Sequence, residues 1–186
     1  HLLAHMKLIT PLIFAGIVCI SQFTARAESP SKTVLSDGWA IQPAGEVSES
    51  GAVISTTQFH PKNWFAATVP STVAGALVDD KVYPDPFVAM NLKDLSTNNA
   101  FKGPWWYRKE FKVSRGDDSQ VWLNFEGINY RANIWLNGKQ IADTNEIVGA
   151  YRTYQFNITD AALASGNTLV LAVETFPADK NSLGIN

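Results

Sequence analysis

The chain has 186 residues, of which 17% are charged, and its formal net charge is −2 at pH 7. So small a negative charge provides no field that attracts nucleic acid or an anionic membrane surface, and neither is expected as a partner. Without the first 27 residues about 160 remain, enough for one domain with a sizeable core but not for two.

The first 27 residues are predicted to lie outside any folded domain. Met6 is the expected initiator; one lysine, a mostly apolar run over 8–20 and an A-x-A site at 25–27 follow it. These are the parts of a secretory signal peptide, which predicts export to the periplasm or the medium. Two alternatives stay open: a buried N-terminal helix and a lipid anchor at Cys19. Because Cys19 is the only cysteine, the exported part has no disulfide to stabilise it.

Residues 28–186 are expected to form a single domain that begins with short strands. The first half contains one helical pattern, over 71–79, with Ser71 as its N-cap. Residues 81–103 follow as a long loop with two prolines, and loops of this length in compact domains tend to be functional. The strands predicted before the helix cover 35–41, 53–57 and 65–70.

The segment from Gly103 to Gly138 contains four of the six tryptophans and three alternating strand patterns. It ends in Asn137-Gly138, and an Asn-Gly pair after an alternating strand is a strong signal for a hairpin turn. Further strands are predicted over 151–158 and 168–176, with one helical turn possible over 159–164. Short strands separated by polar turns predict an all-β protein, an antiparallel jelly-roll β-sandwich with one short helix.

Motifs for most catalytic chemistries are missing from the sequence. After the signal segment His60 is the one histidine, and a metal site needs three or four ligands, so no metal is expected. His60 is predicted to be a solvated loop residue. The sequence has no G-x-S-x-G elbow and no phosphate-binding glycine loop, and no cofactor is expected. Spacing singles out no carboxylate pair for glycoside cleavage, although Glu110 and Glu126 lie on or beside predicted strands.

Aromatic side chains are the remaining candidates for ligand contacts, because sugar rings stack on indole and phenol groups. Alternation predicts that most of them face the core instead, Trp135 included. The expected exception is Pro104-Trp105-Trp106, since adjacent strand residues point to opposite faces. The candidates considered are Trp105, Trp106, Trp122, Trp135, Tyr107, Tyr130 and Tyr151.

Five segments occur in an order and at a spacing that resemble a known family. They read VPSTVAGALVDD, YPDPFVAMNL, GPWWYRKEF, FEGINYRANIWLNGKQIA and GNTLVLAVETF. Together they resemble the N-terminal sugar-binding domain of glycoside hydrolase family 2, a galactose-binding-like jelly-roll. The resemblance runs from about Trp39 to Asn186 and favours the exo-β-D-glucosaminidase and β-mannosidase members.

The resemblance implies a longer, secreted enzyme. Family members place immunoglobulin-like β-domains and a TIM barrel after this domain, and two barrel glutamates perform a retaining hydrolysis. Residues 28–186 would be the first domain, truncated at its C-terminal edge, inactive alone and packed on the downstream domains. The expected substrate is a carbohydrate with a terminal β-linked glucosamine or mannose. The alternative from another class is a free-standing, lectin-like carbohydrate-binding module.

The resemblance also implies two substrate-binding residues in the long loop. Asn91 aligns with an asparagine that contacts the terminal sugar in relatives, and an amide can donate to and accept from hydroxyl groups. Asp85 is expected to shape the loop or to contact the sugar. The competing interpretation of Asn91 is a residue that bonds its own backbone. No catalytic residue is expected before Asn186.

Overall fold

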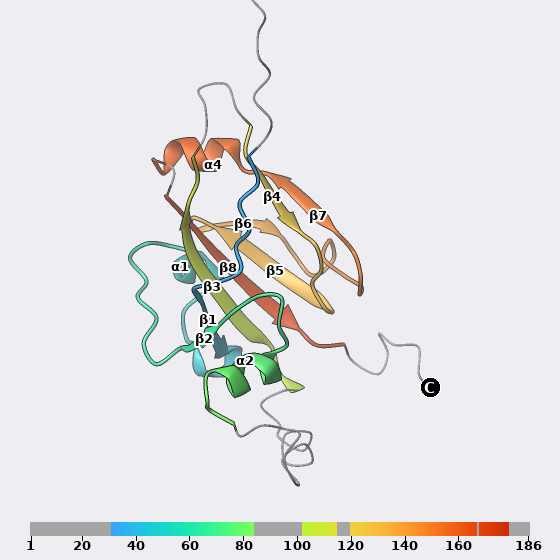
Figure 1. Cartoon of the computed structure of the whole chain (residues 1–186). Coiled ribbons are helices and arrows are strands. Elements are labelled where there is room, and N and C mark those ends of the chain that lie inside the picture. The colour runs from blue at the N-terminus through green and yellow to red at the C-terminus, as the bar shows by residue number, and fades with distance from the viewer. Residues whose placement is uncertain (1–30, 84–101, 115–119, 167, 179–186) are drawn as a thin grey trace, which may run out of the picture. The chain divides into compact units, whose positions relative to one another are not determined.

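The computed structural model describes residues 31–83, 102–114, 120–166 and 168–178. The described residues from Val34 onward belong to one compact unit. Within that part, eight strands form two antiparallel sheets (Figure 1). The strands are β1 (Trp39–Pro43), β2 (Phe65–Ala67), β3 (Trp105–Lys112), β4 (Trp122–Phe125), β5 (Arg131–Leu136), β6 (Lys139–Ala142), β7 (Tyr154–Asn157) and β8 (Thr168–Phe176).

The larger sheet has the order β2-β1-β3-β8-β5-β6, and the smaller sheet pairs β4 with β7. Along the chain the strands alternate between the sheets. The first three belong to the larger sheet, β4 to the smaller, β5 and β6 to the larger, β7 to the smaller, and β8 to the larger. This alternation between two antiparallel sheets confirms the predicted all-β class and the sandwich. The strand prediction over 168–176 is confirmed residue for residue.

The main core fills the space between the two sheets. In β3 the odd-numbered residues, such as Trp105 and Phe111, face this core, while Trp106 and Arg108 face the other side of the larger sheet. The alternating pattern read from the sequence is therefore confirmed. Core residues from the other elements include Ile41, Leu123, Ile134, Leu136, Leu169, Leu171 and Val173, and Phe156 packs against them.

The outer side of the larger sheet is also covered, by the segment that connects β1 to β2. There η1 (Ala44–Glu46) and α1 (Gly51–Ile54) lie over the sheet, and a second hydrophobic cluster forms beneath them. This outer cluster consists of buried Ile54, Trp106 and Ala172, with Ala44, Val47, Phe59, Trp64 and Trp135 partly buried around them.

Trp135 belongs to this outer cluster and not to the main core. Its ring centre lies 5.3 Å from that of Trp106. Gly51 packs so closely on the indole that a Cβ atom there would lie 2.3 Å from Cδ2 of Trp135. A side chain at Gly51 would therefore force the ring to move, which explains a glycine at the first residue of α1.

Two predictions about local structure are wrong. The predicted strand over 53–57 is instead α1 and the turn after it. The helical stretches expected over 71–79 and 159–164 are present, as α2 (Val73–Asp79) and α4 (Thr159–Ala164). The N-cap of α2 is Thr72 and not Ser71, because the Thr72 hydroxyl accepts the Gly75 N–H at 3.0 Å.

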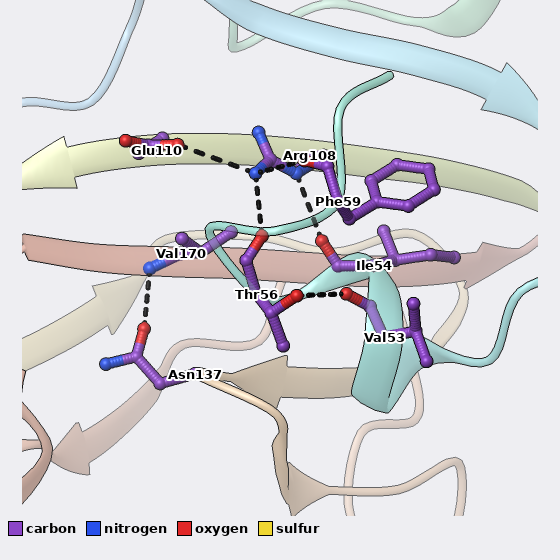
Figure 2. A network of polar contacts seen from close by, with 8 residues as sticks. All are labelled: Val53, Ile54, Thr56, Phe59, Arg108, Glu110, Asn137 and Val170. Atoms are coloured by element: carbon purple, nitrogen blue, oxygen red, sulfur yellow. Dashed lines mark hydrogen bonds and ion pairs between the residues drawn. The ribbon is translucent and has the colours of Figure 1, made fainter. Parts of the chain in front are cut away.

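The Asn137-Gly138 turn is confirmed as the hairpin that joins β5 to β6. Both residues have positive φ, 48° and 83°, as a type I′ turn requires. The Asn137 side-chain oxygen accepts the Val170 N–H at 2.8 Å (Figure 2). The Gly138 N–H donates to the Ser55 hydroxyl at 2.9 Å, so the turn is bonded both to the central strand β8 and to the segment after α1.

Tyr107 provides a test of the main core at high pH. Burial raises the pKa of its phenol from 10.0 to about 12. The folded state therefore favours the neutral form, and this contribution is complete below pH 10 and lost as the pH rises towards 12. We expect wild type to lose about 2 kcal/mol more of its free energy of unfolding than Tyr107→Phe between pH 9 and 12, measured by urea denaturation. Tyr151→Phe, at a fully exposed position, should follow wild type. Parallel loss in wild type and Tyr107→Phe would contradict the burial of this phenol.

Among the described residues, no helix has the length and apolar character needed to cross a membrane.

Candidate functional site

The two predicted substrate-binding residues, Asp85 and Asn91, lie outside the described residues, so their roles stay predictions. The ends of their segment are described. Before it, Tyr83 packs against the main core. After it, the Pro104 carbonyl accepts the Ala44 N–H at 2.9 Å, and Trp105 pairs with β1 and β8. Both ends of the predicted loop are thus attached to the body of the sandwich.

The prediction that Trp105 and Trp106 include the exposed tryptophan is wrong. Trp105 and Trp106 are only 3% and 4% exposed, because one packs in the main core and the other in the outer cluster. Neither can serve as a sugar-stacking platform. Trp122 in β4 is 52% exposed, and Tyr151 is fully exposed. From the sequence, Trp122 was grouped with the core. The signal that could have indicated its exposure is alternation, because Trp122 lies on the face of β4 opposite the buried residue next to it.

A buried arginine holds the covering segment in place (Figure 2). Arg108 Nε donates to the Ile54 carbonyl at 3.0 Å, and Nη2 donates to the carbonyls of Thr56 and Phe59 at 3.0 and 3.1 Å. The Glu110 carboxylate lies 3.5 Å from Nη2, and the guanidinium carbon lies 5.9 Å from the centre of the Phe59 ring. The role of Arg108 is therefore to satisfy three backbone carbonyls and not to bind substrate.

Electrostatics at Arg108 agree with that role. Burial lowers the pKa of the guanidinium, and the neighbouring Glu110 opposes this shift. Arginine nevertheless stays charged under ordinary conditions, because its unperturbed pKa is far above neutral. Of the three carbonyls bonded to Arg108, that of Ile54 belongs to α1 and the other two belong to the segment after it.

A surface hollow of about 500 Å³ lies beside this network. Glu46, Glu49, His60 and Lys62 contribute its charged and titratable groups. His60 is exposed, as the sequence predicted. The Glu46 carboxylate accepts a hydrogen bond from the Gln42 amide at 2.7 Å, which ties this wall to β1. The hollow therefore carries both acidic and basic groups.

Two further observations concern possible metal ligands and carboxylates in the described part of the chain. It contains no group of three or more His, Cys, Asp or Glu side chains that could hold a metal ion. The carboxylates that the sequence put forward, Glu110 and Glu126, are both exposed on the surface. The described residues form a β-sandwich with polar and aromatic side chains on its surface.

Comparison with known proteins identifies the family. A family profile described as the glycosyl hydrolase 2 galactose-binding domain-like domain matches residues 39–183. The chain belongs to this family of domains. That is the family predicted from the five sequence segments.

Similar curated proteins are glycosidases. The exo-β-D-glucosaminidase of Streptomyces avermitilis is 30% identical over 158 residues, which cover 85% of this chain and 17% of that protein. The mannosylglycoprotein endo-β-mannosidase of Lilium longiflorum is 33% identical over 156 residues, covering 80% of this chain and 16% of that protein. The chain thus spans less than a fifth of the length of these relatives.

Solved structures of glycosidases are also similar to this chain. The exo-chitosanase of Amycolatopsis orientalis superimposes with a TM-score of 0.65 at 29% identity, over 78% of this chain and 16% of that protein. The β-D-mannosidase of Dictyoglomus thermophilum gives a TM-score of 0.52 at 31% identity, over 75% of this chain and 15% of that protein.

Proposed function

We propose that this chain is the N-terminal sugar-binding domain of a secreted, retaining exo-glycosidase that removes terminal β-linked glucosamine or mannose. The observation that supports this proposal most is the similarity, in sequence and in fold, to exo-β-D-glucosaminidases, of which the chain spans less than a fifth. The signal-peptide pattern before residue 28 supports export.

In this proposal the chemistry belongs to a barrel domain outside the 186 residues. One glutamate would protonate the leaving oxygen while the other attacks the anomeric carbon, and water would then hydrolyse the glycosyl-enzyme. The domain described above would pack on the downstream domains and present the Asn91 loop to the sugar. By itself it would be inactive.

The test is to read the gene past Asn186 and to assay the protein that it encodes. We expect several hundred further residues with a barrel and two catalytic glutamates, and hydrolysis of p-nitrophenyl β-D-glucosaminide or β-D-mannoside. The 186-residue chain, assayed beside it, should hydrolyse neither. A stop codon after Asn186 would contradict the proposal and favour the free-standing carbohydrate-binding module.

Asn91→Ala in the longer enzyme should lower kcat/KM about tenfold and leave the melting temperature unchanged. The reason is the loss of an amide that bonds the terminal sugar, worth roughly 1–2 kcal/mol. Asn98→Ala, in the same predicted loop, is the matched control and should keep wild-type kinetics. A lower melting temperature with unchanged kcat/KM would instead show that Asn91 stabilises its own loop.

A further inference from the structure

The two-stranded sheet has one face in the core and one face exposed. Leu123 of β4 pairs across the sheet with Phe156 of β7, and both pack in or against the main core. Because side chains alternate along a strand, the residues on either side of this pair point away from the core. Four exposed side chains occupy that outer face, here called the amide platform: Trp122, Asn124, Gln155 and Asn157.

Register places these four residues in two opposite pairs. Trp122 lies across from Asn157, and Asn124 lies across from Gln155. Strands in a sheet are about 4.8 Å apart, and residues two apart along a strand are separated by about 6.8 Å. The platform therefore offers an indole and three amides within the length of about two sugar rings. None of the four side chains carries a charge.

Hydrogen bonds fix two members of the platform in advance. The indole Nε1 of Trp122 donates to the Gln120 side-chain oxygen at 3.2 Å. The Asn157 side-chain oxygen accepts the Thr159 N–H at 3.0 Å and the Thr159 hydroxyl at 2.7 Å. Groups that are already oriented lose less conformational freedom on binding, which favours affinity.

The geometry points to a sugar-binding surface on the amide platform, separate from the predicted Asn91 loop, that holds a β-linked sugar chain. The indole, 52% exposed, supplies an apolar face for one pyranose ring. Amides donate and accept at once, as do sugar hydroxyls, so they suit a hydroxyl-rich ligand. The choice of a β-linked glucosamine or mannose chain rests on the proposed function.

The binding test uses the 186-residue chain with mannohexaose and with the β-1,4-linked glucosamine hexamer. Titration calorimetry is performed at about 0.5 M salt, which screens attraction between the cationic hexamer and the acidic protein. We expect binding of at least one hexamer, with a blue shift of tryptophan emission. Trp122→Ala should weaken it tenfold or more, and Gln155→Ala severalfold.

Leu163→Ala is the matched control, because Leu163 has the same exposed fraction as Trp122 but lies on α4 and outside the platform. It should bind as wild type does. Each protein is first checked for an unchanged melting temperature. Binding that survives Trp122→Ala, or no binding of either hexamer, would overturn the inference.

A second measurement separates the sugar from a neighbouring domain as the occupant of the platform. In the longer protein, acrylamide should quench wild-type emission more than that of Trp122→Phe, and bound hexamer should reduce the difference. Equal quenching without sugar would mean that another domain covers Trp122, and the inference would fail. Hydrolysis by the longer enzyme tests the proposed function independently, since it needs no platform residue.

Discussion

Arg108→Met is expected to lower the free energy of unfolding by about 3–5 kcal/mol, through the loss of three hydrogen bonds from a charged donor. The substitution keeps much of the side-chain bulk but leaves the carbonyls of Ile54, Thr56 and Phe59 without their donor. When a buried or partly buried carbonyl loses a charged donor, the loss of stability is larger than the contribution of an ordinary hydrogen bond. Urea denaturation followed by circular dichroism measures the effect.

Glu110→Gln is the control for Arg108→Met. The Glu110 side chain is 49% exposed, and an ion pair near solvent contributes at most about 1 kcal/mol. We expect a small change for Glu110→Gln and a large one for Arg108→Met. Similar changes in the two variants would mean that the ion pair, and not the three carbonyls, gives Arg108 its importance.

Trp135→Ala is expected to cost about 3 kcal/mol, at the lower end for a large aromatic residue because the ring is only partly buried. The truncation opens a space beside Gly51 and Trp106, both of which pack on the indole. Thermal and urea unfolding of the purified chain measure the loss.

Trp122→Ala is the comparison for Trp135→Ala, since it removes the same side chain from an exposed position. Its expected effect on the free energy of unfolding is within about 0.5 kcal/mol. If Trp135→Ala were as stable as Trp122→Ala, α1 would not be packed on the sheet as described.

Sequence reasoning predicted the strands well because their signal is local. Alternation and turn residues are read within a few positions, as for β8 and the Asn137-Gly138 turn. The segment containing α1 was predicted wrongly because its partner, Arg108, lies more than 48 residues further along the chain. A pattern in the segment itself cannot contain that contact.

The candidate site was predictable only in part. Alternation assigns Trp105 and Trp106 to opposite faces, but it does not state that both faces of the larger sheet are covered. The covering segment on one side and the smaller sheet on the other decide that both rings are buried. The exposure of Trp122 also depends on tertiary structure. Its ring is exposed because no described residue packs over the outer face of the smaller sheet there.

The place of β8 has a consequence for the order of folding during synthesis. It is the last described strand, yet it lies between β3 and β5 and pairs with both. Until residues 168–176 are available, the strands β2-β1-β3 and β5-β6 form two separate pieces, each with an unpaired edge that can recruit another chain. Closing a sheet through contacts so distant in sequence is slow. The six-stranded sheet is therefore expected to form as one late event, after its final strand has left the ribosome.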